Sequence, residues 1–191
     1  HPLPVQRPIP VWFGGGSDAT LRRMARAISL ERYQALIDEI RSRIPEAAIT
    51  TDVLTGFPGE SEEEFREGLD FIKRMEFAGG HVFTFSTRKG TPAAGFPDQV
   101  PHSVRKSRSA EVRQLLQSSG EKYRKSFLSQ ELDVLWEQFL ENEAGIGLLT
   151  GLTDNYLKVE AEGPADLWNH FSRVRIDGLV PAGVRGMIVK S

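Results

Sequence analysis

The chain has 191 residues, of which 39% are hydrophobic and 26% are charged, and its formal net charge is -2. Such a charge gives no overall basic field to attract nucleic acid, and no apolar run approaches the roughly 18 residues of a membrane span. Cysteine is absent, so these residues provide no disulfide, no thiolate nucleophile and no sulfur ligand for zinc or an iron–sulfur cluster. With no signal-peptide pattern at its start, the chain is expected to be soluble and cytoplasmic.

Charge and hydrophobic periodicity both change near residue 128. Residues 1–127 carry 19 basic and 16 acidic side chains, whereas residues 128–191 carry 5 and 10. Before the change, short apolar runs alternate with segments of helical period; after it, short β-type runs are separated by Gly, Pro, Asn and Asp. We therefore predict an α/β region over residues 1–100, a basic linker helix over residues 101–127 and a small all-β domain over residues 128–191.

In the α/β region, predicted strands and helices alternate along the chain. The strands are expected at Ile9–Phe13, Ile49–Leu54 and His81–Phe85. The helices are expected over residues 19–26, from Ser29 to the proline at 45, from a capping box of Ser61 and Glu64, and from Ser103 to about residue 128. Their order implies a parallel sheet with right-handed crossovers. In the second helix, one face is predicted to be buried, and it carries Tyr33, Leu36, Ile37, Ile40 and Ile44.

Ligands of parallel α/β sheets bind where loops leave the carboxyl ends of the strands. Three such loops are predicted, at Gly14–Asp18, Gly56–Glu60 and Ser86–Thr91. In the first loop, the backbone can approach a phosphate or carboxylate closely, although a glycine run also serves simply to make a turn. The first loop therefore predicts a phosphate-binding site made of Gly14, Gly15, Gly16 and Ser17.

Polar side chains lie near the other two strand ends. Thr51 and Asp52 are within the second strand, and Glu60 follows it. A binding role for Glu60 competes with its role as a first-turn acid favoured by the helix dipole. Arg88, with the neighbouring Lys89, is a candidate anion ligand or an ordinary solvated loop residue. The histidines lack metal-ligand spacing, so we predict no metal site.

Five short strands in the last 64 residues predict an OB-like closed barrel. They are expected at Leu132–Trp136, Ile146–Thr150, Tyr156–Glu160, Val174–Leu179 and Val184–Val189. Such barrels bind RNA through a basic groove with aromatic platforms, and the candidates here are Tyr156, Lys158, Arg173, Arg175, Arg185 and Lys190. The ten acidic residues of this region weigh against phosphate binding. The preceding helix has seven cations, among them Arg105 and Lys106, which either contact RNA or form a solvated helix face.

Three motifs carry a family resemblance. The run from SLERYQALIDEI through TTDVLTGFPGESEEEF, then HVFTFSTRKGTPAA, then GLTDNYLKV resembles the C-terminal portion of radical SAM tRNA methylthiotransferases, especially those acting on threonylcarbamoyladenosine. The resemblance covers roughly residues 17–191. It implies part of a radical SAM (βα) barrel followed by a TRAM β-barrel that grips tRNA.

The resemblance also implies positions for ligand contacts. The family's S-adenosylmethionine site matches Thr51, Asp52, Gly56, Phe57, Gly59, Glu60, Phe85 and Arg88 of this chain. In the TRAM domain it favours Asn155 and Tyr156 as RNA contacts. The loop at Phe85–Thr91 departs from the family's YSPRPGTPA, with Phe85, Thr87 and Lys89 in place of tyrosine and two prolines.

The N-terminal run departs further. Where the family reads HxPLQSGSD, this chain reads PVQRPIPVWFGGGSD, which resembles a segment of luciferase-like flavin or deazaflavin oxidoreductases. We hypothesise that residues 1 to about 16 derive from such a barrel and the rest from a methylthiotransferase. A flavin or deazaflavin oxidoreductase remnant is therefore the alternative function, and a non-catalytic RNA or protein interaction module is another.

The resemblance implies an iron–sulfur-dependent reaction for which this chain lacks the cluster ligands. The family uses S-adenosylmethionine and 4Fe-4S clusters, and a cluster requires cysteines that this chain lacks. We therefore expect a C-terminal fragment that retains tRNA binding and part of the S-adenosylmethionine wall but is inactive alone. A partial barrel also leaves strand edges unpaired, which predicts self-association.

Overall fold

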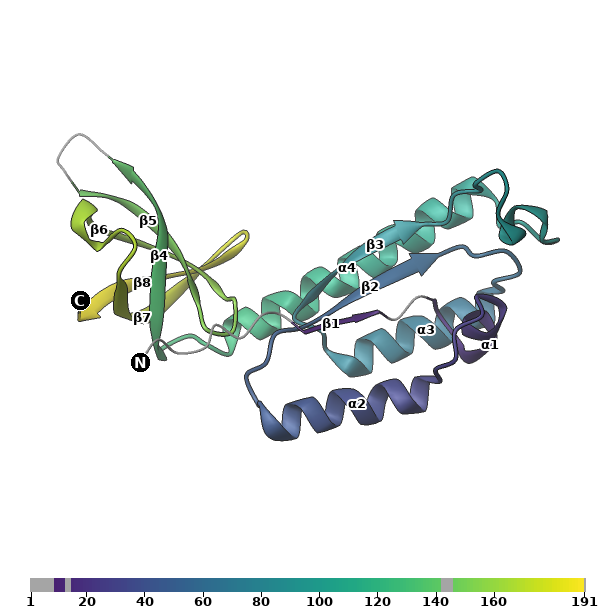
Figure 1. Ribbon diagram of the computed structural model, residues 1–191, viewed down its shortest axis with the longest axis horizontal. Coiled ribbons are helices and arrows are strands. Elements are labelled where there is room, and N and C mark those ends of the chain that lie inside the picture. Colours follow the sequence, from purple (N-terminus) through teal and green to yellow (C-terminus); the bar gives the residue numbers. More distant parts are fainter. Residues whose placement is uncertain (1–8, 13–14, 142–145, 191) are drawn as a thin grey trace. The chain divides into compact units, whose positions relative to one another are not determined.

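The computed structural model describes residues 9–12, 15–141 and 146–190 (Figure 1). It forms two compact units. An α/β unit contains residues 9–45 and 49–120, and a barrel unit contains residues 121–190 together with Glu46–Ala48. None of the helices in the described ranges combines the length and apolar character needed to cross a bilayer.

The α/β unit is built on a three-stranded parallel sheet, as the alternating pattern predicts. The order is β1-β2-β3, with β2 in the centre. Its strands are β1 (Ile9–Trp12), β2 (Ile49–Thr55) and β3 (Gly79–Thr84). Its helices are α1 (Asp18–Arg23), α2 (Leu30–Arg43) and α3 (Glu62–Met75), followed by the short 3-10 turn η1 (Pro92–Gly95) and by α4 (His102–Lys125).

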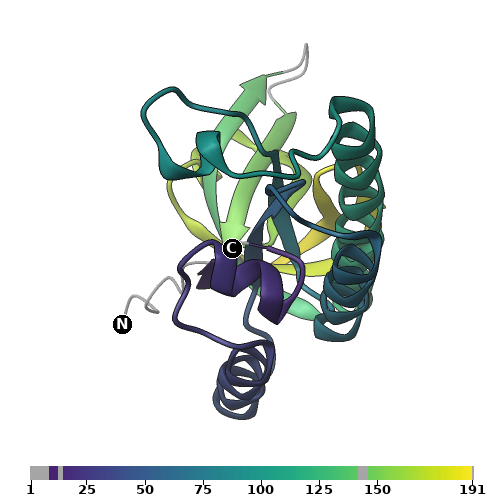
Figure 2. The same cartoon turned by 90° about the vertical axis from the view of Figure 1, so that its right-hand side faces the viewer.

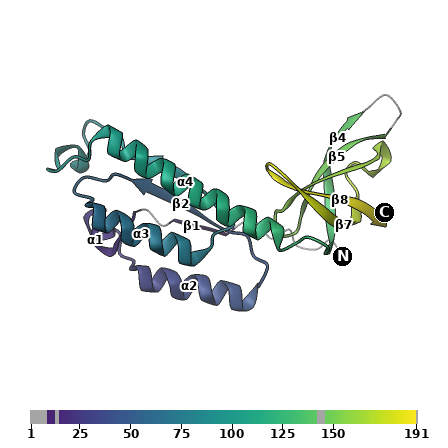
Figure 3. The ribbon, with the colours of Figure 1, turned by 180° about the vertical axis from the view of Figure 1, so that it is seen from behind.

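Helices cover only one face of β2 and β3. In Figure 1 the strands lie in front of α3 and α4, and in the view from behind in Figure 3 these helices lie in front of the strands. Burial along β2 alternates accordingly: Ile49, Thr51, Val53 and Thr55 are buried under the helices, because successive strand residues point to opposite faces. Figure 2 shows both helices on the same side of the sheet. The opposite face stays available for a ligand.

Helix α3 begins and packs as local chemistry dictates. Ser61 accepts a hydrogen bond from the Glu64 backbone and Glu64 reaches back to the Ser61 backbone, which confirms the predicted capping box. In the middle of the helix, Gly68 allows the Gly16 backbone to touch α3, since a Cβ there would overlap the Gly16 carbonyl oxygen. The helix is thereby held close to the first strand–helix loop.

The first four-fifths of α4 belong to the α/β unit rather than to a free linker. Val112 and Leu116 are buried, and the hydroxyl of Ser119 donates to the carbonyl of Phe77 at 2.8 Å. The buried side follows helical spacing because Val112, Leu116 and Ser119 are three or four residues apart. This part of α4 therefore completes the helical layer.

The barrel unit is a closed five-stranded barrel of order β4-β5-β6-β8-β7, which confirms the predicted all-β barrel. Its strands are β4 (Glu131–Glu141), β5 (Ile146–Thr153), β6 (Lys158–Pro164), β7 (Phe171–Val180) and β8 (Gly183–Lys190), with the 3-10 turn η2 (Ala165–Leu167) after β6. Trp136 is fully buried in the core, and its indole N–H donates to the Ser172 hydroxyl at 2.9 Å. Val134, Leu149, Val159 and Val174 surround it in the same cluster.

Several element boundaries differ from the prediction for local reasons. The third strand begins at Gly79 rather than at His81, because Gly80 lies against the Thr51 carbonyl, where a Cβ would overlap. Tyr156 has φ 65°, so it belongs to a turn and not to the predicted strand start. Leu36 was predicted to be buried, but it is 42% exposed, since α2 contacts the unit mainly through Leu30, Tyr33 and Ile37.

Candidate ligand-binding site

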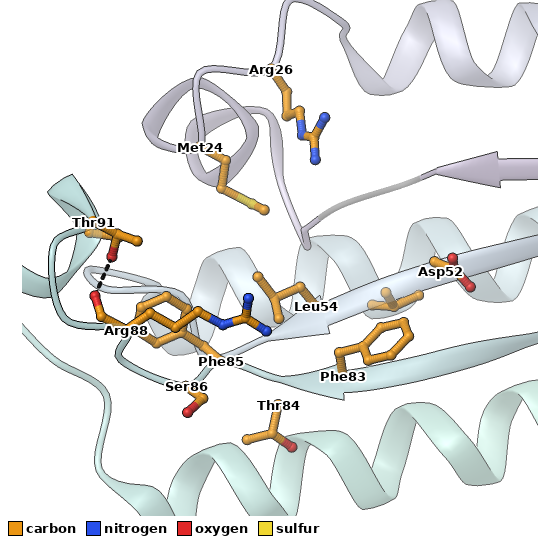
Figure 4. A pocket seen from close by; sticks show the side chains of 12 residues that line it. Met24, Arg26, Asp52, Leu54, Phe83, Thr84, Phe85, Ser86, Arg88 and Thr91 are labelled. Carbon is orange, nitrogen blue, oxygen red and sulfur yellow. Dashed lines mark hydrogen bonds between the residues drawn. The ribbon is translucent and has the colours of Figure 1, made fainter.

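A pocket of about 500 Å³ lies on the face of the sheet that the helices leave open. This volume is within the range of about 300–1,000 Å³ typical of small-molecule sites. It lies toward the carboxyl ends of β2 and β3 and is closed by the loops that follow α1 and β3 (Figure 4). Its lining residues are Met24, Arg26, Asp52, Val53, Leu54, Phe83, Thr84, Phe85, Ser86, Arg88, Thr91 and Ala93.

The floor of the pocket is apolar. Leu54 and Phe83 are direct partners on neighbouring strands and project to the same side of the sheet. Phe83 is 52% exposed, an unusual state for a phenylalanine in the middle of a unit. The thioether of Met24 faces this floor from the other side of the pocket.

Charged groups lie around this floor. Asp52 projects from β2, and the guanidinium groups of Arg26 and Arg88 point into the pocket from the loops after α1 and β3. The Arg88 loop is ordered by Thr91, whose hydroxyl donates to the Arg88 carbonyl at 2.8 Å. The pocket therefore offers a carboxylate for hydroxyl or ammonium donors and two guanidinium groups for a carboxylate.

The Gly56–Glu60 loop supports the pocket from behind. The Glu60 carboxylate is buried, accepts the Gly56 N–H at 2.8 Å and pairs with the Arg108 guanidinium, also at 2.8 Å. Arg108, itself 6% exposed, also donates to the Glu60 carbonyl and lies 5.0 Å from the centre of the Phe65 ring. Burial raises the pKa of Glu60, because desolvation outweighs the hydrogen bonds from Gly56 and Arg108 that act to lower it.

A second arginine of α4 secures the same loop. The Arg105 side chain lies against Gly56, where any Cβ would overlap it and where φ is 74°, and it donates to the Phe85 carbonyl. The Phe57 ring packs edge-on against Phe85, with 5.4 Å between centroids. The pocket wall at Phe85 is thus fixed by α4 and by the glycine loop.

The structure places the eight predicted S-adenosylmethionine contacts in three locations. Asp52, Phe85 and Arg88 line the pocket. Thr51 faces the helices, and the other four residues, Gly56, Phe57, Gly59 and Glu60, form the supporting loop. Sequence reasoning missed Met24, Arg26, Leu54 and Phe83. The two-residue spacing from Asp52 to Leu54 could have identified Leu54, but nothing local indicates that the loop after α1 reaches the sheet.

The glycine run offers no phosphate cradle among its described residues. Gly15 is packed against Met24 and Thr20, and Gly16 against the α3 backbone. Ser17 is buried and caps α1 by accepting the Thr20 N–H at 3.1 Å. Gly14 lies outside the described residues. The three glycines and the serine were predicted as a phosphate site, whereas the described ones serve packing and capping.

The cations predicted to bind RNA on the barrel are engaged by carboxylates. On the barrel strands, the four cations whose side chains are described each have an acidic partner: Lys158 with Glu160 at 3.8 Å, Arg173 with Asp133 at 3.1 Å, Arg175 with Glu131 at 2.8 Å and Arg185 with Asp177 at 3.3 Å. An RNA phosphate would have to compete with these carboxylates. On α4, Arg105 donates to the Phe85 backbone carbonyl rather than to a carboxylate, and Lys106 is exposed.

The turn after β5 places Asn155 and Tyr156 differently. Asn155 is 5% exposed, and its side-chain oxygen lies within hydrogen-bond distance of the Thr153 hydroxyl. That hydroxyl also accepts the Leu157 N–H at 2.9 Å, so the turn is held from inside. Tyr156 is 37% exposed. Of the two predicted contacts, Tyr156 is accessible to a partner and Asn155 is structural.

Fold and site together define an α/β unit with a ligand-sized pocket, joined along the chain to a small closed β-barrel. The chain is 35% identical over 161 residues to the threonylcarbamoyladenosine tRNA methylthiotransferase MtaB of Bacillus subtilis, covering 84% of the chain and 36% of that protein. It is 45% identical over 120 residues to the tRNA-2-methylthio-N(6)-dimethylallyladenosine synthase of Acidothermus cellulolyticus. This alignment covers 63% of the chain and 24% of that protein. The chain belongs to the radical SAM tRNA methylthiotransferase family.

The match covers a limited part of these relatives. The chain spans about a third of the length of the curated relatives it matches. The synthase of Maricaulis maris is 34% identical over 189 residues, which is 99% of this chain and 39% of that protein, so this alignment includes most of residues 1–16. No protein-family model matches. The luciferase-like resemblance falls mainly on residues outside the described ranges and stays a prediction.

Proposed function

We propose that this chain forms one wall of the S-adenosylmethionine site of a tRNA methylthiotransferase and carries the family's RNA-binding TRAM barrel. One observation supports this most directly: a ligand-sized pocket of the α/β unit is lined by Asp52, Phe85 and Arg88, which the family resemblance independently assigns to S-adenosylmethionine. On this proposal the sheet is part of a radical SAM barrel whose interior face is the open face. The predicted functional parts are included in the same proposal: an α/β region over residues 1–100, a basic linker helix over residues 101–127 and an all-β domain over residues 128–191.

The pocket residues fit S-adenosylmethionine chemically. Leu54, Phe83 and Phe85 supply apolar surface for the adenine, Asp52 an acceptor for ribose hydroxyls or the ammonium, and Arg26 or Arg88 a partner for the methionine carboxylate. The residues do not fit an iron–sulfur cluster, because none of the 191 is a cysteine. We therefore propose that these residues bind and orient the ligand but do not catalyse methylthio transfer alone.

Binding of S-adenosylmethionine is the first expected result. Arg88→Ala removes a guanidinium from the pocket and should weaken binding by about tenfold, the value of one charge-assisted hydrogen bond. Lys89→Ala is the matched control, since the neighbouring lysine is exposed and does not line the pocket. Isothermal titration of the full chain measures both. Equal affinities for the two variants, or no binding to the wild-type chain, would overturn the proposal.

We also propose tRNA as the macromolecular partner, on the basis of the family. Because the described barrel cations are paired with carboxylates, exposed cations of the α/β unit such as Lys106 should carry the phosphate contacts. Lys106→Ala should weaken tRNA binding and lower the slope of log K against log salt by about one. Arg175→Ala, which removes a cation already paired with Glu131, should change the slope less. Filter binding at several salt concentrations distinguishes them, and a larger effect of Arg175→Ala would contradict the assignment.

The edges of β1 and β3 that face away from β2 have no strand partner among the described residues, which supports the proposed self-association. The flavin or deazaflavin alternative gains no support, because the described glycines of its motif are packed against protein atoms.

A further inference from the structure

We propose that the groove between β6 and β8 of the barrel binds an extended, basic protein segment. This goes beyond the proposed function, because it assigns a protein partner to a surface that is separate from the S-adenosylmethionine pocket. The groove has a volume of about 650 Å³ and is lined by β5, β6, β7 and β8. Three features of these strands support the assignment: an incomplete strand pair, an apolar border and an excess of acidic over basic side chains.

The barrel closes between β6 and β8 through a very short pairing. These parallel strands pair only at Val159 with Val184 and at Glu160 with Arg185. Beyond that point, β6 pairs with β5 and β8 pairs with β7, but they do not pair with each other over the described residues. Main-chain groups of Ala161 and Gly186 therefore border an open groove. An extended chain that adds along such an edge gains backbone hydrogen bonds irrespective of its sequence.

Exposed aliphatic side chains flank this edge on both sides. Leu148 on β5 is 39% exposed and Met187 on β8 is 59% exposed, and both line the groove. Ile146 and Val189, two residues further along the same strands, are also about half exposed. Aliphatic residues exposed together on the two strands that flank β6 are typical of protein contact surfaces. RNA-binding barrels instead present aromatic rings for stacking, and none of the described residues that line this groove is aromatic.

The groove's charge selects a basic partner. Among its described lining residues, Glu160, Glu162 and Asp177 are acidic and Arg185 is the one cation. Asp177 is paired with Arg185 at 3.3 Å and Glu160 with Lys158 at 3.8 Å. Glu162 is exposed, has no ion-pair partner among the described residues and is the cross-strand neighbour of Leu148. The Glu162 carboxylate beside aliphatic side chains, in a groove with more acidic than basic residues, disfavours RNA phosphates and complements a strand that alternates lysine or arginine with aliphatic residues.

The test uses the full chain and a short, terminally capped peptide of alternating lysine and valine, labelled for fluorescence anisotropy. We expect saturable binding that Glu162→Lys weakens by at least about tenfold through charge reversal. Met187→Asp should weaken it as well by removing an apolar contact. Asp166→Lys, an equal charge change on the exposed η2 turn outside the groove, should leave affinity within about twofold.

Two controls test whether the groove binds a basic peptide rather than an acidic peptide or RNA. The same peptide with glutamate in place of lysine should not bind, and oligouridylate should not displace the basic peptide. Thermal melts of all variants confirm folding, which is expected because Glu162, Met187 and Asp166 are exposed. The proposal is overturned if the basic peptide does not bind, if Glu162→Lys and Asp166→Lys act alike, or if oligouridylate competes for the groove. None of these results depends on S-adenosylmethionine binding.

Discussion

Arg108→Leu is expected to lower the free energy of unfolding of the α/β unit by about 3–5 kcal/mol, the usual effect of removing one partner of a buried ion pair. The reason is Glu60, whose side chain is 1% exposed and which would be left without its counter-charge. Arg113→Leu, on the exposed side of the same helix, should change stability by less than about 1 kcal/mol. Urea denaturation followed by circular dichroism compares them.

The Arg108 effect should depend on pH in a defined direction. Desolvation raises the pKa of Glu60 already in the wild-type chain, and loss of Arg108 removes groups that oppose this rise. Because the pKa of Glu60 is raised in the folded state, protonation of Glu60 stabilises the folded chain at acidic pH. This contribution is lost as the pH rises through that pKa. The deficit of Arg108→Leu should therefore be larger at neutral than at acidic pH. A deficit that does not vary with pH, or that matches Arg113→Leu, would contradict this account of the loop.

Trp136→Ala should destabilise the barrel by about 3–5 kcal/mol, because it leaves a large cavity and an unpaired Ser172 hydroxyl. The chain contains its own control in Trp168, which is 52% exposed and donates one hydrogen bond to the Glu137 carbonyl at 3.1 Å. Trp168→Ala should lower stability by under about 1.5 kcal/mol.

Hydrogen exchange measures this difference within each unit. In Trp136→Ala, amides of the barrel strands should lose protection while those of β2 and α3 keep it, since the two units have separate cores. Equal effects of the two tryptophan substitutions would show that Trp136 is not the centre of the core. Loss of protection in both units would show that they unfold as one.

Local signals predicted much of the fold. Ser29 and Ser61 start helices as side-chain caps, and the apolar runs around Val53 and Trp136 form strands, because these features depend on residues a few positions apart. The end of β4 was predicted too early. A bulge between Trp136 and Gln138 lets that strand continue to Glu141, and no residue pattern marked it.

The site was harder to predict, because long-range pairs build it. Arg108 pairs with Glu60 across 48 positions, so a residue counted with the cations of a solvated or RNA-binding helix is in fact a buried support. The family motif identified Asp52, Phe85 and Arg88, but Phe83 becomes a pocket residue only because no helix covers that face of the sheet. Barrel cations were predicted as RNA contacts from residue type alone, whereas their carboxylate partners lie on neighbouring strands.

Amide NMR tests most directly whether the open face of the sheet binds S-adenosylmethionine. The chain is titrated with S-adenosylhomocysteine, the demethylated form of the ligand, and chemical shifts are followed residue by residue. The account predicts saturable shifts at Asp52, Leu54, Phe83, Phe85 and Arg88, with the barrel strands unchanged. The absence of saturable shifts, or shifts centred on the barrel, would contradict it.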